Sequence, residues 1–287
     1  MSGASKPGLE DQTAASRPTV FQPGLFAGRA VMVSAAGSGI GRDIAALYAR
    51  LGAKLIICGE DRAGLQTCAD GLRGLGSPDV LVQAIDTRES AQVEQRMDEA
   101  WQHCGGIDVL VNSIGRHHPQ RALDYSSKGW KEGIAANLNG TWYMMHAVAR
   151  RWRESGRPGN ILNLVATFQR GMPGLANSCA AGAAVTYLSK TVAVEWAEYR
   201  IRVNCVAPGV IAKAGSIQYS TATVGALTGA NPMKHAGQLQ DIAEAVVYLT
   251  APSGAFVTGE LLTVDGGGSL WGETWAIAKP DYFKFKS

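Results

Sequence analysis

The chain has 287 residues, of which 46% are hydrophobic and 18% are charged, and its formal net charge is +3 at pH 7. This composition is typical of a soluble globular protein, and the length suits one large α/β domain or two small ones. So small a charge argues against a nucleic-acid-binding protein. No apolar run approaches the ~18 residues that a membrane-spanning helix needs, so neither nucleic acid nor membrane is an expected partner.

Cysteine usage and the chain ends favour a cytoplasmic protein. The five cysteines are scattered and form no CxxC pair, which predicts neither a zinc site nor a disulfide framework. No metal site is expected, and a reducing cytoplasm fits best. Residues 1–22 are rich in Ser, Ala, Gly, Pro and Thr without an apolar stretch, which is typical of a disordered tail and not of a signal peptide. The cysteines are Cys58, Cys68, Cys104, Cys179 and Cys205.

Short β-branched runs alternate with helical stretches from Gly28 onward. Their near-continuous hydrophobicity is what strands covered on both faces require. The alternation predicts an α/β fold in which residues 23–287 form a single domain, with a doubly wound parallel sheet flanked by helices. The basic run at residues 150–157 is interpreted as the solvated end of a helix. Seven strands are predicted at residues 29–34, 53–59, 79–86, 107–115, 159–166, 200–209 and 260–267, and helices at residues 43–51, 90–103, 138–154 and 176–199.

A glycine-rich stretch, SAAGSGIG, follows the first predicted strand and leads into a helix. Glycines here let the backbone approach a pyrophosphate, and the helix N-terminus then faces the anion. A tight turn explains a lone glycine cluster equally well, but the position after the first strand favours a dinucleotide site.

The second predicted strand ends in CGEDR, where a residue normally reads the adenosine ribose. Glu60 can accept hydrogen bonds from a free 2′-hydroxyl and would repel a 2′-phosphate, whereas Arg62 would partly offset that repulsion. This balance favours NAD over NADP as the cofactor. The alternative is that the two residues are a solvated charge pair on a loop.

Five motifs in this order resemble the short-chain dehydrogenase/reductase superfamily. Its Rossmann-like fold and NAD(P) binding are implied for residues 23–271. Within the superfamily, the stretches PGLFAGRAVMV, SSKGW and RVNCVAPGVI are similar to the peroxisomal trans-2-enoyl-CoA reductases and dienoyl-CoA reductases. The five motifs are SAAGSGIG, LVNSIG, NLNGTWYM, EWAEYRIRVNCVAPGVI and FVTGELLTVDGGGSLW.

The resemblance implies where the cofactor binds. The family's usual Thr-Gly opening is Ser34-Ala35 here. If that position needs a positive φ, alanine costs roughly 1 kcal/mol or more. Residues implied to line the diphosphate are Ser34, Gly37, Ser38, Gly39, Ile40 and Gly41; those near the adenosine are Glu60, Asp86 and Asn112 to Gly115; those bordering the nicotinamide are Pro208, Gly209 and Ile211.

The same resemblance assigns the catalytic positions, and most of them are altered. The family's Tyr-x-x-x-Lys places both side chains on one helix face, because residues four apart differ by only about 40°. Counting back from EWA, the tyrosine position is Ser178 and the lysine position is Gly182. The usual serine falls near Ala166 or Thr167, and only Asn137 matches the family's pattern.

Neither nearby substitute reaches the vacant position. Tyr187 lies nine residues beyond Ser178, which puts it on the opposite face of the helix at about 100° per residue. Lys190 lies further along the axis. Gly182 leaves three readings open: space for substrate, space for a neighbouring helix, or drift.

Ketone reduction is therefore not expected, because an unassisted serine hydroxyl is a poor acid. The enoyl reductase branch tolerates this loss, since the protein there need only hold the thioester oxygen near donors. The expected catalytic residues are Ser178, Thr167 and Asn137. His117 or His118 and Arg170 are weaker candidates that are better explained as surface residues, and Cys179 is interpreted as a packed helix residue.

Three classes of function remain open: an enoyl-CoA-reductase-like oxidoreductase, a non-redox enzyme such as a lyase, hydratase or isomerase, and a catalytically silent subunit or ligand-binding protein. The expected substrate is a small molecule, with an acyl-CoA as the first choice. A homodimer or homotetramer is expected, because Ala180, Ala181, Ala183 and Ala184 permit close helix approach. Assembly with an intact homologue is the alternative.

Overall fold

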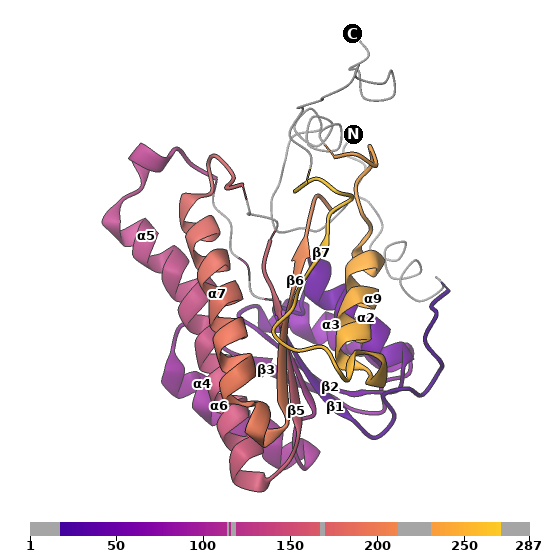
Figure 1. Ribbon diagram of the computed structural model, residues 1–287. Helices are drawn as coiled ribbons and strands as arrows, with labels where there is room; N and C mark the ends of the chain where they lie inside the picture. The colour runs from indigo at the N-terminus through magenta and orange to yellow at the C-terminus, as the bar shows by residue number, and fades with distance from the viewer. Residues whose placement is uncertain (1–17, 114, 116–118, 167–169, 212–230, 271–287) are drawn as a thin grey trace, which may run out of the picture.

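The computed structural model describes residues 18–113, 115, 119–166, 170–211 and 231–270. Seven parallel strands form one sheet in the order β3-β2-β1-β4-β5-β6-β7 (Figure 1). This confirms the predicted doubly wound sheet, and each strand lies inside its predicted range. The strands are β1 Ala30–Ser34, β2 Lys54–Gly59, β3 Val80–Ala84, β4 Val109–Asn112, β5 Gly159–Leu164, β6 Ile201–Pro208 and β7 Leu261–Val264.

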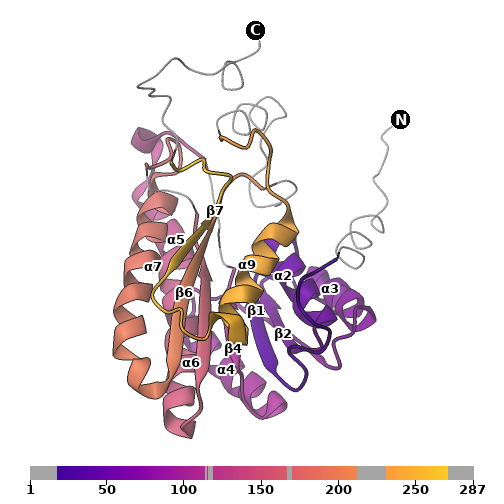
Figure 2. The same ribbon diagram turned by 45° about the vertical axis from the view of Figure 1, so that its right-hand side comes forward.

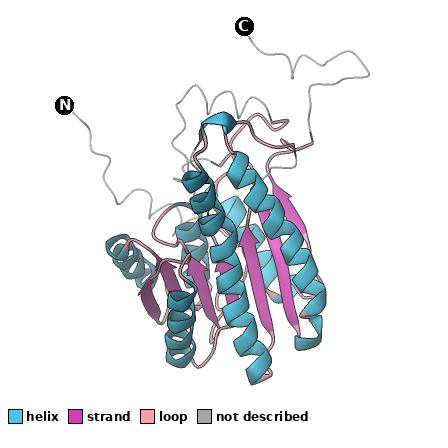
Figure 3. Ribbon diagram, turned by 90° about the vertical axis from the view of Figure 1, so that its left-hand side faces the viewer, coloured by secondary structure: helices cyan, strands magenta, loops and turns pink. Residues whose placement is uncertain are grey.

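Helices cover both faces of the sheet (Figure 2). One face carries α2 (Gly39–Arg50), α3 (Arg62–Gly74) and α9 (Leu239–Thr250). The other carries α4 (Ser90–Cys104), α6 (Gly140–Ser155) and α7 (Ala176–Glu195), and Figure 3 shows helices lying along the strands on this face. Helix α5 (Ser127–Ile134) packs on α7. Four short elements complete the described chain: η1 (Ala122–Asp124), the π-helix η2 (Ala135–Asn139), η3 (Ala197–Tyr199) and η4 (Pro252–Gly254).

The side chains of β1 alternate between two hydrophobic cores. Val31 and Val33 of β1 pack with α2, α3 and α9. Met32 of the same strand packs with α4, α6 and α7. Side chains on both faces of this strand are therefore buried. Such burial explains why the predicted strands are continuous hydrophobic runs in the sequence.

The described chain begins against the first of these cores. The side-chain amide of Gln240 on α9 donates to the carbonyl oxygen of Pro18 at 2.8 Å. Phe21 and Leu25 pack against the core between α2 and α9. Residues 18–22 of the predicted tail thus lie on the domain, and the rest of that prediction lies outside the described residues.

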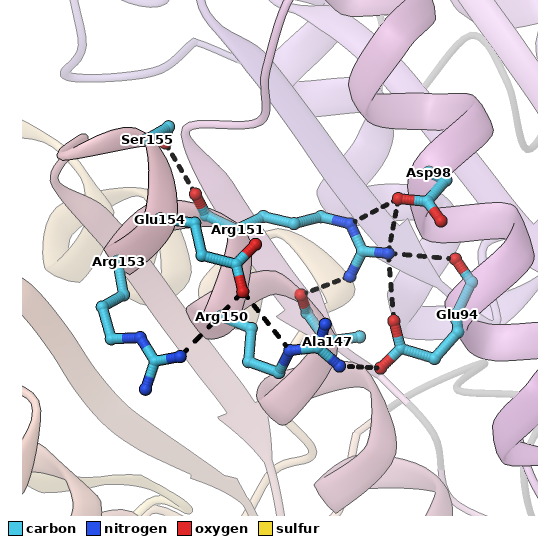
Figure 4. Close-up of polar contacts among 8 residues, drawn as sticks. All are labelled: Glu94, Asp98, Ala147, Arg150, Arg151, Arg153, Glu154 and Ser155. Carbon is cyan, nitrogen blue, oxygen red and sulfur yellow. Dashed lines mark hydrogen bonds and ion pairs between the residues drawn. The ribbon is translucent and has the colours of Figure 1, made fainter.

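The basic run at residues 150–157 contains one residue that the solvated-helix interpretation gets wrong. Arg151 is only 9% exposed, and its guanidinium pairs with Asp98 at 2.6 Å and with Glu94 at 3.0 Å (Figure 4). Its Nη1 also donates to the Ala147 carbonyl oxygen at 2.7 Å. Both carboxylates belong to α4, so this arginine joins α6 to α4. Helix packing that no local pattern encodes turns a residue of an apparently solvated run inward.

None of the helices that the structure describes is both long enough and apolar enough to cross a membrane.

Candidate active site

The predicted cofactor residues gather at the carboxyl edge of the sheet. Chain order reverses between β1 and its neighbour β4, and ligands of open α/β sheets bind outside the strand ends at such a switch point. The ends of these two strands are linked, because the Ser113 amide donates to Ser34 Oγ at 3.0 Å. The ends of β1 and β4 are therefore held together where a ligand would bind.

The turn between β1 and α2 has the close backbone packing of a phosphate loop. Ala35 adopts a positive φ of +50°, so the strain anticipated at the Ser34-Ala35 opening is present and costs about 1–2 kcal/mol. A Cβ on Gly41 would lie 2.6 Å from the Ala35 carbonyl oxygen. Only glycine therefore lets α2 begin so close to this turn.

The N-terminus of α2 is open to an anion. Its N-cap, Ser38, has an extended backbone and makes no side-chain capping bond, and the first turn holds no acidic residue. The amide groups of a first helical turn have no partner inside the helix. Together with the helix dipole, they favour a phosphate group at this point.

A cavity of about 540 Å³ adjoins this loop and the ends of β2 and β3. Its volume lies within the usual range of small-molecule sites, so the residues present fit a nucleotide. Four predicted cofactor residues, Gly37, Ser38, Glu60 and Gly115, are on its wall. The other lining residues are Ala35, Gly59, Asp61, Leu65, Ile85 and Thr87.

Arg88 changes the electrostatics around Glu60 and Asp86. The Asp86 carboxylate accepts three hydrogen bonds of 2.6 to 3.0 Å from the Arg88 guanidinium. This bonding raises the pKa of Arg88, and the Coulombic attraction of Glu60 adds to the rise. Arg88 therefore adds positive charge to this region, and Arg62, the cation expected to offset the charge of Glu60, is the first residue of α3.

Asn112 lies beneath the site, with its side chain turned into the sheet. It is 1% exposed, and its Nδ2 donates to Asn163 Oδ1 on β5 at 2.9 Å. Asn163 Nδ2 in turn donates to Ser189 Oγ on α7 at 2.9 Å. This buried chain of polar groups ties β4 through β5 to α7, the helix that carries Ser178 and Gly182.

The nicotinamide side of the predicted site lies at the end of β6. Pro208 is the last residue of this strand, and the Gly209 amide donates to the Val264 carbonyl oxygen at 2.9 Å. A Cβ on Gly209 would lie 2.6 Å from Asp265 Cα, so glycine is required there. Ile211 forms an isolated bridge with Gly237. The backbone is thus held firmly where the resemblance implies the nicotinamide.

Ser178 lies in the first turn of α7 and is 2% exposed. Its Oγ donates to Asn177 Oδ1 at 3.4 Å, and the Tyr125 hydroxyl donates to the same oxygen at 3.0 Å. A Cβ at Gly133 of α5 would clash with Asn177 Nδ2. Because Gly133 has no Cβ, the Asn177 amide nitrogen can pack against α5. Asn177 Oδ1 meanwhile accepts hydrogen bonds from two hydroxyl groups.

Asn137 and Gly182 complete the described part of the catalytic region. Asn137 is 9% exposed and lies in the π-helix η2, and such irregular turns frequently occur at functional sites. Both η2 and α5 contact α7. The Gly182 carbonyl oxygen accepts a bond of 2.9 Å from Thr186 Oγ1. Thr167, His117 and His118 lie outside the described residues.

Tyr187 is on the outer face of α7, as its spacing from Ser178 predicts, and Lys190, further along the helix, is also exposed. The Tyr187 side chain is 70% exposed, and the Lys190 ammonium lies 5.3 Å from its ring centroid. Cys179 is half-buried, and its thiol points to the Met172 carbonyl oxygen at 3.9 Å. Arg170 is exposed. The exposed Tyr187 and Lys190 therefore lie on another face of α7 than the buried Ser178.

The sequence prediction missed Tyr125, Asn177 and Arg88. Tyr125 precedes Asn177 by 52 positions, and no periodicity in its segment indicates that it will meet α7. Arg88 follows Asp86 by two positions, so a local charge pair was readable, but its closeness to Glu60 was not. Asn177 is adjacent to the predicted position Ser178. The direction of its side chain, towards Gly133 of α5, depends on how α5 packs on α7.

Comparisons with known proteins agree with this geometry. Residues 34–269 match the family model described as Enoyl-(Acyl carrier protein) reductase. The chain is 30% identical over 244 residues to a probable 2,4-dienoyl-CoA reductase of Bacillus subtilis, which covers 83% of this chain and 96% of that protein. It is also 30% identical to a glucose 1-dehydrogenase of Gluconobacter oxydans, over 86% of this chain and 94% of that enzyme.

A solved structure shows the same architecture. The citronellol catabolism dehydrogenase of Pseudomonas aeruginosa PAO1 superposes with a TM-score of 0.78 at 34% sequence identity, covering 88% of this chain and 100% of that chain. Sheet order, the glycine-rich turn at the switch point and the family match therefore agree. The chain is an oxidoreductase-fold protein that belongs to the short-chain dehydrogenase/reductase superfamily, whose members use nicotinamide cofactors.

Proposed function

We propose that this chain uses a nicotinamide cofactor to reduce the carbon–carbon double bond of a conjugated acyl thioester. The observation that carries the proposal is the buried Ser178 hydroxyl. We assign to Ser178 the position of the superfamily's tyrosine and to Gly182 that of its lysine, by counting back from EWA. The similarity to a probable 2,4-dienoyl-CoA reductase supports this choice of substrate. The similarity to a glucose 1-dehydrogenase shows that homology by itself does not select it.

The residues for the cofactor are those around the β1–α2 turn. Gly37, Ser38 and the first turn of α2 would hold the diphosphate, and Glu60 would accept hydrogen bonds from the ribose. Pro208, Gly209 and Ile211 would border the nicotinamide. Bound there, the reduced cofactor supplies a hydride.

The chain's own residues then have a modest chemical task. Hydride addition at the β-carbon sends an electron pair to the thioester oxygen, and a proton from water or a nearby donor completes the product at the α-carbon. Ser178 would donate a hydrogen bond to that oxygen once its hydroxyl turns from Asn177, and Asn137 would support the donor set. Preorganised donors of this kind stabilise the developing negative charge.

The reduction of simple ketones requires a proton donor that this site lacks. Their reduction requires full protonation of an alkoxide, which a tyrosine with a lowered pKa normally supplies. Ser178 has no lysine one turn further along α7 to assist it, because that position is Gly182. Turnover of secondary alcohols and ketones is therefore expected to be absent.

One panel of trans-2-enoyl-CoA substrates tests the proposal. Consumption of reduced cofactor and product mass are followed together, and cofactor oxidation matched by saturated product is expected. Ser178→Ala, or Thr167→Ala if that hydroxyl aligns the oxygen, should lower kcat by about 10–1000-fold. Thr191→Ala, which removes an exposed hydroxyl of the same helix, is the matched control and should leave kcat unchanged.

The other two classes of function give different results in this assay. A lyase, hydratase or isomerase would convert substrate without consuming cofactor, and a silent subunit would bind nucleotide without converting any acyl-CoA. Either result would overturn the proposal. Steady activity on a ketone panel that Ser178→Ala abolishes would contradict the role given to position 182.

We also propose that copies of the chain associate through the outer faces of α6 and α7. Tyr187 and Val194 are 70% and 79% exposed there, and Trp142 of α6 stacks on Trp196 after α7. Ala180 and Ala183 lie on the exposed side, whereas Ala181 is fully buried and does not contribute. Sedimentation at micromolar concentration should show a dimer or tetramer, and a monomer would refute this.

A further inference from the structure

A second cavity, of about 820 Å³, lies at the edge of the sheet opposite the candidate active site. Its walls come from the residues at the starts of β1, β4, β5 and β6 and from the segment after α9. In a parallel sheet these amino ends share one edge, far from the carboxyl ends where the cofactor residues gather. The lining residues are Arg29, Asp108, Val109, Pro158, Gly159, Asn160, Ala197, Arg200, Ile201, Arg202, Thr250, Ala251, Pro252, Ala255, Phe256 and Thr258.

The charges on this wall are unbalanced. Three arginines, Arg29, Arg200 and Arg202, face one carboxylate, that of Asp108. Asp108 is already engaged: its Oδ2 accepts from the Ala30 amide at 2.8 Å, and its Oδ1 pairs with Arg157 at 3.2 Å. The described part of the chain thus presents an excess of positive charge to the cavity.

Arg202 is the most constrained of the three cations. It is half-buried, and its Nη1 donates to the carbonyl oxygens of Leu249 and Val257 at 2.9 and 2.8 Å. Burial lowers its pKa, and no carboxylate among the described residues pairs with it to offset the lost hydration. A guanidinium held in this way keeps its remaining N–H groups for an acceptor, and its planar fork matches a carboxylate.

The other arginines leave charge free beside it. Arg200 Nη2 donates to the Gly156 carbonyl oxygen at 2.5 Å, and the Arg29 guanidinium lies 5.8 Å from the centroid of the Phe26 ring. Neither contact involves a carboxylate, so neither neutralises its arginine. Both residues are exposed and add to the field around Arg202.

Apart from Asn160, Thr250 and Thr258, the remaining wall is apolar, and one large side chain on it is exposed to solvent. Phe256 is fully exposed, and Val109, Ala197 and Pro252 line the same space. A small inorganic anion would leave this surface wet, whereas a ligand with an apolar body would cover it. The pairing of arginines with an apolar wall therefore selects an amphipathic anion.

We propose that this cavity is a second ligand site, distinct from the active site, that binds an organic carboxylate with an apolar body. The carboxylate lies against Arg202, flanked by Arg29 and Arg200, and the apolar body covers Phe256. The carboxylate can be that of a free aliphatic acid or the terminal carboxylate of a peptide. The site is independent of the reaction at the other edge of the sheet.

Titration calorimetry on the full chain, with saturating reduced cofactor, tests this site with decanoate as the probe. Saturable binding of decanoate is expected. Decanol, which lacks the carboxylate, and acetate, which lacks the apolar chain, should bind at least about tenfold more weakly. A short apolar peptide with a free C-terminus, set against its C-terminal amide, distinguishes the peptide source from the free acid.

Variants locate the binding. Arg202→Gln should weaken decanoate binding about tenfold or more, and Phe256→Ser should weaken it several-fold. Arg153→Gln, an exposed arginine of α6 outside the cavity, is the matched control and should change nothing. Cofactor affinity should be the same in all variants. If Arg202→Gln fails to fold, the exposed pair Arg29→Gln and Arg200→Gln replaces it with the same expected loss.

Three results would overturn the proposal. One is decanol binding as tightly as decanoate. Another is binding that none of the arginine variants weakens, which would place the acid at the catalytic edge. The third is an affinity for decanoate that falls as the chain self-associates, since a second copy would then cover the cavity.

Discussion

The Tyr125 hydroxyl donates a hydrogen bond of 3.0 Å to Asn177 Oδ1, directly beside the buried Ser178. Ser178 Oγ donates to the same oxygen at 3.4 Å. One amide oxygen thus receives two hydroxyl groups, one from the segment before α5 and one from α7. The Tyr125 bond therefore bears on the orientation of the hydroxyl that the proposed reaction uses.

Tyr125→Phe should impair catalysis more than stability. Loss of one hydrogen bond to a buried acceptor should lower the free energy of unfolding by about 0.5–1.5 kcal/mol. Because Asn177 then holds its amide less firmly beside Ser178, kcat with an enoyl-CoA should fall several-fold while KM changes little. Tyr187→Phe, on the outer face of α7, is the control. Equal kcat values for the two variants would show that Tyr125 does not position Ser178.

Glu60→Ala should reduce the preference for NAD(H) over NADP(H). Glu60 is on the wall of the nucleotide cavity, and removal of its charge relieves repulsion of a 2′-phosphate while a hydroxyl loses an acceptor. A shift of about tenfold in the ratio of dissociation constants is expected from one charged hydrogen bond. Calorimetric titration with both cofactors measures it.

Arg88 provides the reciprocal variant. Arg88→Ala removes a cation whose charge is attracted by Glu60, so it should strengthen the preference for NAD(H). Glu154→Ala, on the exposed side of α6, makes the same charge change as Glu60→Ala and is the control for that variant. An unchanged preference in Glu60→Ala would refute the role of that carboxylate.

Ala35→Gly should stabilise the protein. The residue has a φ of +50°, which costs a side chain about 1–2 kcal/mol, whereas glycine adds about 0.4–1 kcal/mol of unfolded-state entropy. A net gain of about 0.5–1 kcal/mol in the free energy of unfolding is expected from denaturant titration. Ala36→Gly, at a fully buried neighbour without positive φ, should destabilise, and equal effects of the two changes would contradict strain at Ala35.

Stability should fall steeply above pH 9, in part because of Cys58. Burial raises the pKa of this thiol from its ordinary value of 9.0 to about 12. Between these values the unfolded chain loses the proton and the folded chain keeps it, so the stabilisation present below pH 9 is lost as pH rises towards 12. The loss is about 1.4 kcal/mol per pH unit.

Cys58→Ala should therefore flatten the dependence of the free energy of unfolding on pH between 9 and 11. Val33→Ala, which removes buried carbon atoms from the strand that accepts the Cys58 thiol hydrogen bond, should lower stability by an amount that does not vary with pH. Parallel curves for the wild type and Cys58→Ala would show that the thiol does not titrate in this way.

Local chemistry allowed the sequence to predict the sheet and the strained turn after β1. The predicted strands are hydrophobic runs because helices cover both faces of the sheet, and all seven were found. Ala35 stood out because a positive φ is a property of a single residue and its turn. The outward direction of Tyr187 followed from helix geometry alone.

Tertiary structure decided which side chains from distant segments meet. Tyr125 reaches Asn177 only because α5 packs on α7 at Gly133, and Arg151 is turned inward only because α6 lies on α4. The cavity around Arg202 is formed by the starts of four strands and the segment after α9. Backbone periodicity depends on near neighbours in the chain, whereas these contacts depend on how whole elements pack, which no short stretch of sequence specifies.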